Sequence, residues 1–255
     1  MCYCKKHLTS KHLIAASLLL ACAENVSASD SSSHLALGAG YGHKSSIYLD
    51  GKDEITFYPA INTHWKLMYF KKYKVGVYFA GNNDWALSLS YGLDNREDKK
   101  RGNSDLLKGI PDLNNVFVAS IDAEFHHEFG NFNIIYSIDA SDEHNGKIID
   151  LGYSYPWKSN KHAVSLELKA SLISKEVAQY YYGFQTEKKT KGHHNYQPSD
   201  EINWSYGVNY NYAITPSTFL FTLINFSKLS NKIKRSPLVE KTESNSILFG
   251  LTYLF

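Results

Sequence analysis

Residues 117–138 read FVASIDAEFHHEFGNFNIIYSI, and this stretch decides the fold class. Residues two apart in an extended strand lie on the same face. One face of the first segment is apolar and carries Phe117, Ala119, Ile121, Ala123 and Phe125. The other face is polar and carries Ser120, Asp122, Glu124 and His126. After a tight turn at 128–131 the alternation resumes, so the stretch predicts a β-hairpin with one apolar and one polar side.

The same alternation recurs along most of the chain, at 84–94, 147–157, 163–173, 202–214 and in a last segment that ends at Phe255. A soluble β-sandwich also alternates, but three details favour a membrane barrel. The segments reach the length that a tilted strand needs to cross a bilayer. Aromatic residues gather near segment ends. Short turns at 130–131, 158–161 and 215–216 alternate with long connections at 95–114, 175–200 and 230–244, as in outer-membrane barrels.

Between residue 84 and the C-terminus the pattern predicts eight strands. The preceding region is rich in glycine and aromatic residues and offers four further segments, at 35–42, 55–63, 64–70 and 73–80. A closed barrel with both ends in the periplasm has an even number of strands, so ten or twelve remain. We predict an all-β, up-and-down antiparallel barrel of twelve strands, with ten as the alternative.

Residues 1–28 have the features of a signal peptide and are excluded from the fold. Lys5, Lys6 and Lys11 form a basic region, an apolar stretch follows at 13–23, and Val26-Ser27-Ala28 predicts cleavage before Ser29. A lipoprotein signal at 19–22 is the rival reading, although Leu20 is larger than such a signal prefers. We therefore predict a signal peptide at 1–28 and an outer-membrane barrel at 29–255.

Composition excludes several functional classes. All three cysteines lie in the leader, which excludes a disulfide scaffold, cysteine-bound zinc and a cysteine nucleophile from 29–255. Without the leader the chain holds 24 basic and 24 acidic residues, so no global field favours nucleic acid. The mean hydropathy of −0.35 is that of a soluble protein. A barrel reaches such a value because lipid-facing and lumen-facing residues alternate.

Several local motifs carry a family resemblance. Tyr180-Tyr181-Tyr182-Gly183-Phe184 precedes a lysine-rich stretch and then 195–200, which reads NYQPSD. Later SPLV occupies 236–239, and the chain ends in GLTYLF at 250–255, which resembles a barrel-assembly signal. With 37–40 and Tyr58-Pro59 near the start, this series resembles the MltA-interacting protein (MipA/OmpV) family over essentially the whole mature chain. Gly183, after three tyrosines, is interpreted as a point where a strand bends or where the backbone can be approached closely.

The resemblance implies an outer-membrane barrel without catalytic residues. The founding member of that family is described as a scaffold that joins a lytic murein transglycosylase to a bifunctional penicillin-binding protein. Other members are reported as adhesins or porin-like proteins. We therefore expect a non-catalytic scaffold for murein enzymes, with a small-molecule channel or a surface adhesin as the alternative.

Charged residues on the polar strand faces form a predicted lumen network: Asp122, Glu124, Asp139, Asp150, Glu167 and Lys169. An acid–base site or an ion pathway is one interpretation. A hydrogen-bonded, water-lined interior is the favoured one, because polar interiors are normal in these barrels. Lys169 is the expected partner of Glu167 or Asp150, because an unpaired buried charge is costly.

Metal and enzyme chemistry are not favoured. His126 and His127 are adjacent on a strand and point to opposite faces, and His193-His194 has no carboxylate at ligand spacing. A Ser–His lipase is the enzyme rival, but no G-x-S-x-G occurs. No cofactor is expected. Basic patches in the long connections predict contacts with lipopolysaccharide phosphates, or solvated charge instead, at Lys99, Lys100, Arg101, Lys188, Lys189 and Lys191.

Overall fold

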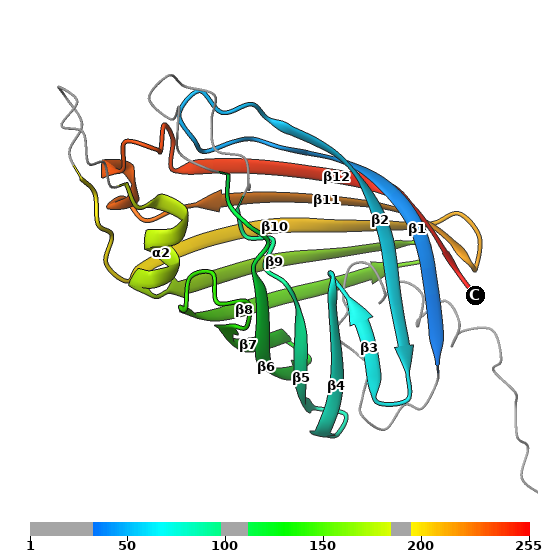
Figure 1. Ribbon diagram of the computed structural model, residues 1–255. Helices are drawn as coiled ribbons and strands as arrows, with labels where there is room; N and C mark the ends of the chain where they lie inside the picture. The colour runs from blue at the N-terminus through cyan, green and yellow to red at the C-terminus, as the bar shows by residue number, and fades with distance from the viewer. Residues whose placement is uncertain (1–32, 98–111, 185–194) are drawn as a thin grey trace, which may run out of the picture.

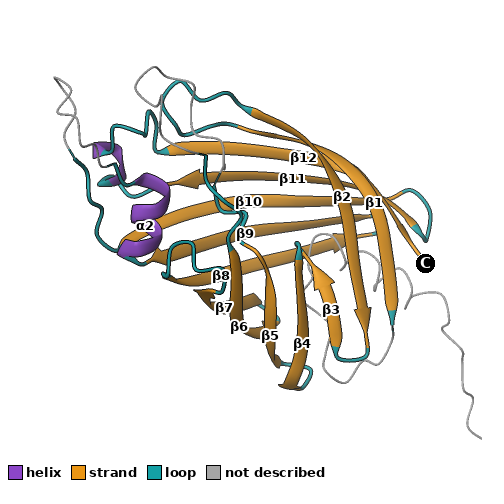
Figure 2. Cartoon of the chain, viewed as in Figure 1, coloured by secondary structure: helices purple, strands orange, loops and turns teal. Residues whose placement is uncertain are grey.

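The computed structural model describes residues 33–97, 112–184 and 195–255 and is a closed antiparallel barrel of twelve strands (Figure 1). Almost all regular structure is strand (Figure 2). In chain order the strands are β1 (His34–Lys44), β2 (Glu54–Trp65), β3 (Met68–Lys71), β4 (Lys74–Gly81), β5 (Trp85–Leu93), β6 (Phe117–His127), β7 (Gly130–Asp139), β8 (Lys147–Ser159), β9 (His162–Ile173), β10 (Glu201–Ala213), β11 (Thr218–Lys228) and β12 (Glu243–Leu254).

The topology is up-and-down. Each strand pairs with its neighbours in sequence, and β1 closes the barrel against β12. At this seam Gly40 lies opposite Gly250, and Gly38 lies opposite Thr252. A Cβ added to Gly38 would come within 2.1 Å of the Leu251 carbonyl oxygen, so glycine permits the close approach there. The twelve-strand prediction is confirmed, and the ten-strand alternative is wrong.

Side chains are arranged inside out relative to a soluble protein. On β9, Leu166 and Leu168 are 53% and 58% exposed on the outer face, whereas Ser165 on the inner face is fully buried. The outer face is apolar because its solvent is lipid, and the inner face is polar because it lines the barrel. In the part of the chain that the structure describes, no helix is both long and apolar enough to cross a membrane.

The two ends of the barrel differ. Both described termini and the short turns at 66–67, 82–84, 128–129, 160–161 and 214–217 lie at one end, which we name the periplasmic end. The long connections lie at the other, outer end, with the two-residue link between β3 and β4 as an exception. Strand pairing is shortest at β3, because β2 pairs with it only from Thr63 to Trp65.

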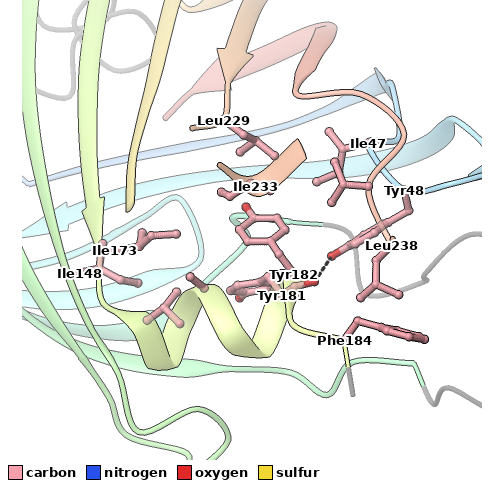
Figure 3. Close-up of a cluster of buried hydrophobic side chains, with 13 residues drawn as sticks. Ile47, Tyr48, Ile148, Ile173, Tyr181, Tyr182, Phe184, Leu229, Ile233 and Leu238 are labelled. Atoms are coloured by element: carbon pink, nitrogen blue, oxygen red, sulfur yellow. Dashed lines mark hydrogen bonds between the residues drawn. The ribbon is translucent and has the colours of Figure 1, made fainter. Parts of the chain in front are cut away.

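A packed apolar cluster fills the outer end and forms the largest hydrophobic core of the described chain (Figure 3). We name this cluster the outer cap. Its members come from connections, strand ends, the helix α2 (Lys175–Tyr182) and the short helix η2 (Ile233–Arg235). They are Ile47, Tyr48, Ile148, Ile173, Val177, Ala178, Tyr181, Tyr182, Phe184, Leu229, Ile233, Leu238 and Val239.

Helix α2 corrects the interpretation of Gly183 as a strand bend. The tyrosines before it are helical, and Gly183 ends the helix by donating its N–H to the Gln179 carbonyl. Val177, Ala178, Tyr181 and Tyr182 are buried at positions i, i+1, i+4 and i+5, which is one face of a helix. Burial of this face in the outer cap stabilises α2. This stabilisation outweighs the preference of tyrosine for strands.

Candidate functional site

Two of the predicted lumen carboxylates lie close together on the inner face of β6. Asp122 and Glu124 are 6% and 8% exposed. Asp122 accepts hydrogen bonds from the Tyr69 hydroxyl at 3.2 Å and the Ser90 hydroxyl at 3.0 Å. Glu124 accepts one from Lys71 Nζ at 2.7 Å. Lys71 was not anticipated as a partner, because β3 has only four residues and little pattern to reveal its inner face.

A second charged group lies nearer the outer end. Arg96 Nη2 donates to Asp150 Oδ2 at 3.3 Å, and Arg96 Nε lies 3.6 Å from Asp94 Oδ2. Burial acts to lower the pKa of Arg96, but the two carboxylates outweigh burial and raise the pKa overall. The Asn209 amide, on β10, donates to Glu167.

The expected partners of Lys169, Glu167 and Asp150, are bound by other residues. Among the described residues, Arg96 holds Asp150 and Asn209 holds Glu167, and Lys169 forms an ion pair with neither carboxylate. The alternation of the sequence showed that these groups face inward. It did not show which residues of other segments lie beside them. Lys169 lies near enough to Asp150 to interact with it electrostatically, but not as a bonded pair.

Asp139 is the last residue of β7, and its carboxylate binds the connection after β7 rather than the charged groups of the lumen. It accepts from the backbone N–H of Ser141 at 2.8 Å, of His144 at 2.6 Å and of Asn145 at 2.8 Å. A carboxylate that accepts several backbone N–H groups holds a turn in place. The six predicted residues thus do not form one network, and Asp139 has a local structural role.

Polar contacts tie the outer cap to the connection after β5. The Tyr182 hydroxyl donates to Glu97 at 2.8 Å, and the Tyr181 hydroxyl donates to Asp94 at 3.2 Å. Burial raises the pKa of Tyr182, and Glu97 raises it further. Figure 3 shows the Tyr48 hydroxyl bonded to the Tyr181 carbonyl, at 3.3 Å. The three buried tyrosine hydroxyls of the cap therefore each have a partner, as buried polar groups usually do.

A pocket of about 430 Å³ lies at the periplasmic end and was not foreseen from the sequence. It is lined by Asn83, Asp84, His126, His127, Glu128, Asn131 and Pro156. These residues come from the β4–β5 turn, the β6–β7 hairpin and β8. The sequence carried no signal for it, because the pairing of neighbouring strands from β5 to β8 brings the three segments together.

The predicted lipopolysaccharide contacts Lys99, Lys100, Arg101, Lys188, Lys189 and Lys191 lie outside the described residues, as do His193 and His194. Within 33–97, 112–184 and 195–255, no three His, Cys, Asp or Glu side chains gather in a way that suits a metal ion. His126 Nδ1 lies 3.3 Å from Asn131 Oδ1, and His127 accepts the Phe129 N–H, so these histidines have separate partners.

Comparison with known proteins connects this barrel to a family. Residues 37–255 match the family model described as MltA-interacting protein MipA, which covers every strand except the first residues of β1. The chain belongs to this family. The match confirms the resemblance seen in the motifs near the C-terminus.

Relatives of this MipA-family chain span its whole length. MltA-interacting protein of Escherichia coli (strain K12) is 22% identical over 250 residues, covering 97% of this chain and 100% of that protein. Putative outer membrane protein YiaT of the same strain is 22% identical over 231 residues, covering 89% and 94%. With the barrel fold, these relationships identify the chain as an outer-membrane protein of the MipA family.

Solved structures similar to the MipA-family barrel include outer-membrane barrels of several functions. The NanC porin aligns with a TM-score of 0.43 and 10% identity, covering 85% of this chain and 98% of the porin. A bacterial polysaccharide outer membrane secretin aligns with a TM-score of 0.46 and 9% identity, covering 88% and 99%.

Proposed function

We propose that this chain is a non-catalytic scaffold that holds a lytic murein transglycosylase, and with it a bifunctional penicillin-binding protein, at the inner surface of the outer membrane. One observation carries the proposal. The chain aligns over 97% of its length with the whole of a protein named for its interaction with MltA. A full-length relationship includes the periplasmic turns, which are the parts of a barrel that a periplasmic enzyme can reach.

The side chains of the barrel support a structural role. Inner-face charges bind one another, as Lys71 binds Glu124 and Arg96 binds Asp150. The outer end is filled by the outer cap, whose members Val177 and Leu238 are fully buried. A side chain committed to such contacts stabilises the barrel and is not poised for proton or acyl transfer. A rigid barrel with short turns suits a fixed docking platform.

A small-molecule channel is the second candidate function, and the polar inner face favours it. Asp122 and Glu124 are the kind of inner carboxylates that select cations in pores. In planar bilayers a channel gives discrete conductance steps, and Glu124→Gln changes their size. A scaffold needs no conducting path and is expected to give no such steps.

Lipid and lipopolysaccharide are further proposed partners. Apolar residues such as Leu168 and Phe249, 58% and 56% exposed, suit the membrane interior. The basic patches at 99–101 and 188–191 suit lipopolysaccharide phosphates, or adhesion to another surface. Replacing these lysines and the arginine with glutamine is expected to weaken binding to lipopolysaccharide vesicles relative to phosphatidylethanolamine vesicles.

Signal-peptide cleavage before Ser29 is proposed as well, and N-terminal mass spectrometry of the purified protein tests it.

Affinity capture from the native envelope tests the scaffold role. The tagged mature protein is extracted in mild detergent, and co-purifying proteins are identified by mass spectrometry against another outer-membrane barrel as control. We expect specific enrichment of a lytic transglycosylase or a penicillin-binding protein. The enriched enzyme is then purified and bound to the barrel in micelles to show direct contact. If neither enzyme exceeds the control, the scaffold role is wrong for this chain.

A further inference from the structure

The pocket at the periplasmic end carries two unpaired carboxylates. Asp84 lies in the β4–β5 turn, and Glu128 lies in the β6–β7 turn. Neither side chain forms an ion pair or a hydrogen bond with a described residue, in contrast to the paired acids farther inside. His126 adds a ring nitrogen, Nε2, that is buried and has no hydrogen-bond partner among the described residues. The pocket therefore has an excess of unused acceptor groups.

Both turns that carry the carboxylates are held rigidly. The Asn82 side-chain oxygen accepts from the backbone N–H groups of Asp84 and Trp85, at 2.8 and 3.1 Å. The Asp84 carbonyl accepts the His126 N–H at 2.7 Å, which ties the first turn to the end of β6, just before the second turn. The Tyr153 hydroxyl donates to the Phe129 carbonyl at 2.5 Å and fixes the second turn. A pre-organised site loses little entropy when it binds a ligand.

The acidic character is local to this sector of the periplasmic end. Two of the other three short turns, with the strand end beside one of them, carry cations instead, at Lys66, Lys158 and Lys161, and the turn at 214–217 is uncharged. Phe129, next to the pocket, is 68% exposed, and its ring centroid lies 5.0 Å from that of His127. An exposed aromatic ring beside two carboxylates suits a guanidinium group, which stacks on rings and binds carboxylates.

We propose that this pocket receives an arginine or lysine side chain from the periplasmic enzyme that the barrel scaffolds. The inference rests on the proposed function and names its docking point. The basic side chain enters between the two turns, pairs with Asp84 and Glu128, and lies against Phe129. The cationic sector around Lys161 disfavours a second basic contact nearby, so charge sets the orientation of the enzyme on the barrel.

The test uses the mature chain folded in detergent micelles, with three proteins compared. They are the wild type, Asp84→Asn/Glu128→Gln, and Asp142→Asn/Glu243→Gln. The last variant removes the same charge from exposed positions at the outer end. Heat-modifiable migration on gels shows that each barrel is folded. Glutamine and asparagine keep the size of the side chains they replace, so loss of folding is not expected.

The first measurement follows the histidine ring signals by NMR during titration with N-acetyl-arginine amide. The uncharged N-acetyl-citrulline amide, which has the same shape, is the ligand control. We expect saturable shifts of the His126 and His127 signals in the wild type and the outer-end control, with a Kd on the order of 10 mM. The shifts should vanish in the pocket variant and with citrulline. Equal shifts with both ligands, or none, would overturn the proposal.

The second measurement is binding of the purified soluble transglycosylase to the same micelles. The pocket variant should bind about fivefold more weakly than the wild type, as expected for the loss of two exposed ion pairs, and its affinity should depend less on salt. Wild-type affinity in the pocket variant would overturn the docking point and leave the scaffold role standing. If the wild type binds no enzyme, the scaffold role fails, and the arginine titration alone decides whether the pocket takes a basic group.

Discussion

Leu238→Ala in the outer cap tests whether the cap is a packed unit that opens separately from the barrel. Leu238 is fully buried, and its carbonyl accepts the Leu49 N–H at 2.8 Å. Truncating a buried leucine costs about 2–5 kcal/mol, because apolar contacts are lost and a cavity remains. The strands do not depend on this side chain, so we expect the loss to appear as local opening of the cap.

The magnitude follows from the burial. A cost of about 3 kcal/mol raises the opening equilibrium of the cap about 100-fold, since each 1.4 kcal/mol is a factor of ten. Amide hydrogen exchange measures that equilibrium when closing is fast. The amides that report on it are Leu49, Leu229 and Glu240, each bonded to a carbonyl within the outer connections. Exchange in the strand peptides should stay unchanged.

Leu168→Ala is the matched control, because it makes the same truncation on the lipid-facing side of β9, where the side chain is 58% exposed. It should leave exchange at 45–53 and 229–242 at the wild-type rate. The reasoning is refuted if Leu238→Ala changes exchange in these segments by less than about threefold, or if Leu168→Ala changes it as much. Either result would mean that the cluster does not hold the outer end closed.

Three further predictions concern other parts of the barrel. Lys71→Met leaves Glu124 without its ion pair and should lower the unfolding free energy in micelles by about 3 kcal/mol; a urea titration should find most of this recovered in Lys71→Met/Glu124→Leu. Burial lowers the pKa of His144, with partial compensation by Asp139, so the folded cap binds a proton more weakly than the unfolded chain. Cap stability is then complete above about pH 6.5 and falls as the pH drops through the folded pKa; near-ultraviolet circular dichroism should follow this loss, and His144→Asn should remove it. Deleting Phe255, which is 71% exposed beside Tyr253, should lower the amount assembled in the outer membrane but not refolding in micelles, and equal amounts in cells would contradict an assembly signal.

The strands of the barrel could be predicted from the order of the residues alone. Alternation with a period of two is a local property, so segments such as 117–127 showed both their strand character and the face that meets lipid. Parity of the strand number then left ten or twelve strands, and we predicted twelve because the region before residue 84 offered four further segments. The motifs near the C-terminus indicated the family, because they are contiguous and need no contact information.

The contacts between inner-face residues could not be predicted in this way. Lys71 and Glu124 lie 53 residues apart, and Arg96 and Asp150 lie 54 apart, so their pairing depends on the register between strands. Helix α2 was missed because its tyrosines favour strands, and the cap that outweighs this preference comes from distant connections. The periplasmic pocket likewise exists only after pairing of the strands from β5 to β8 brings the turns at 82–84 and 128–129 together with Pro156. The two-residue period of a strand and the face on which each side chain lies are set within a few residues. The partners of an inner side chain are set by how the whole sheet is paired and closed.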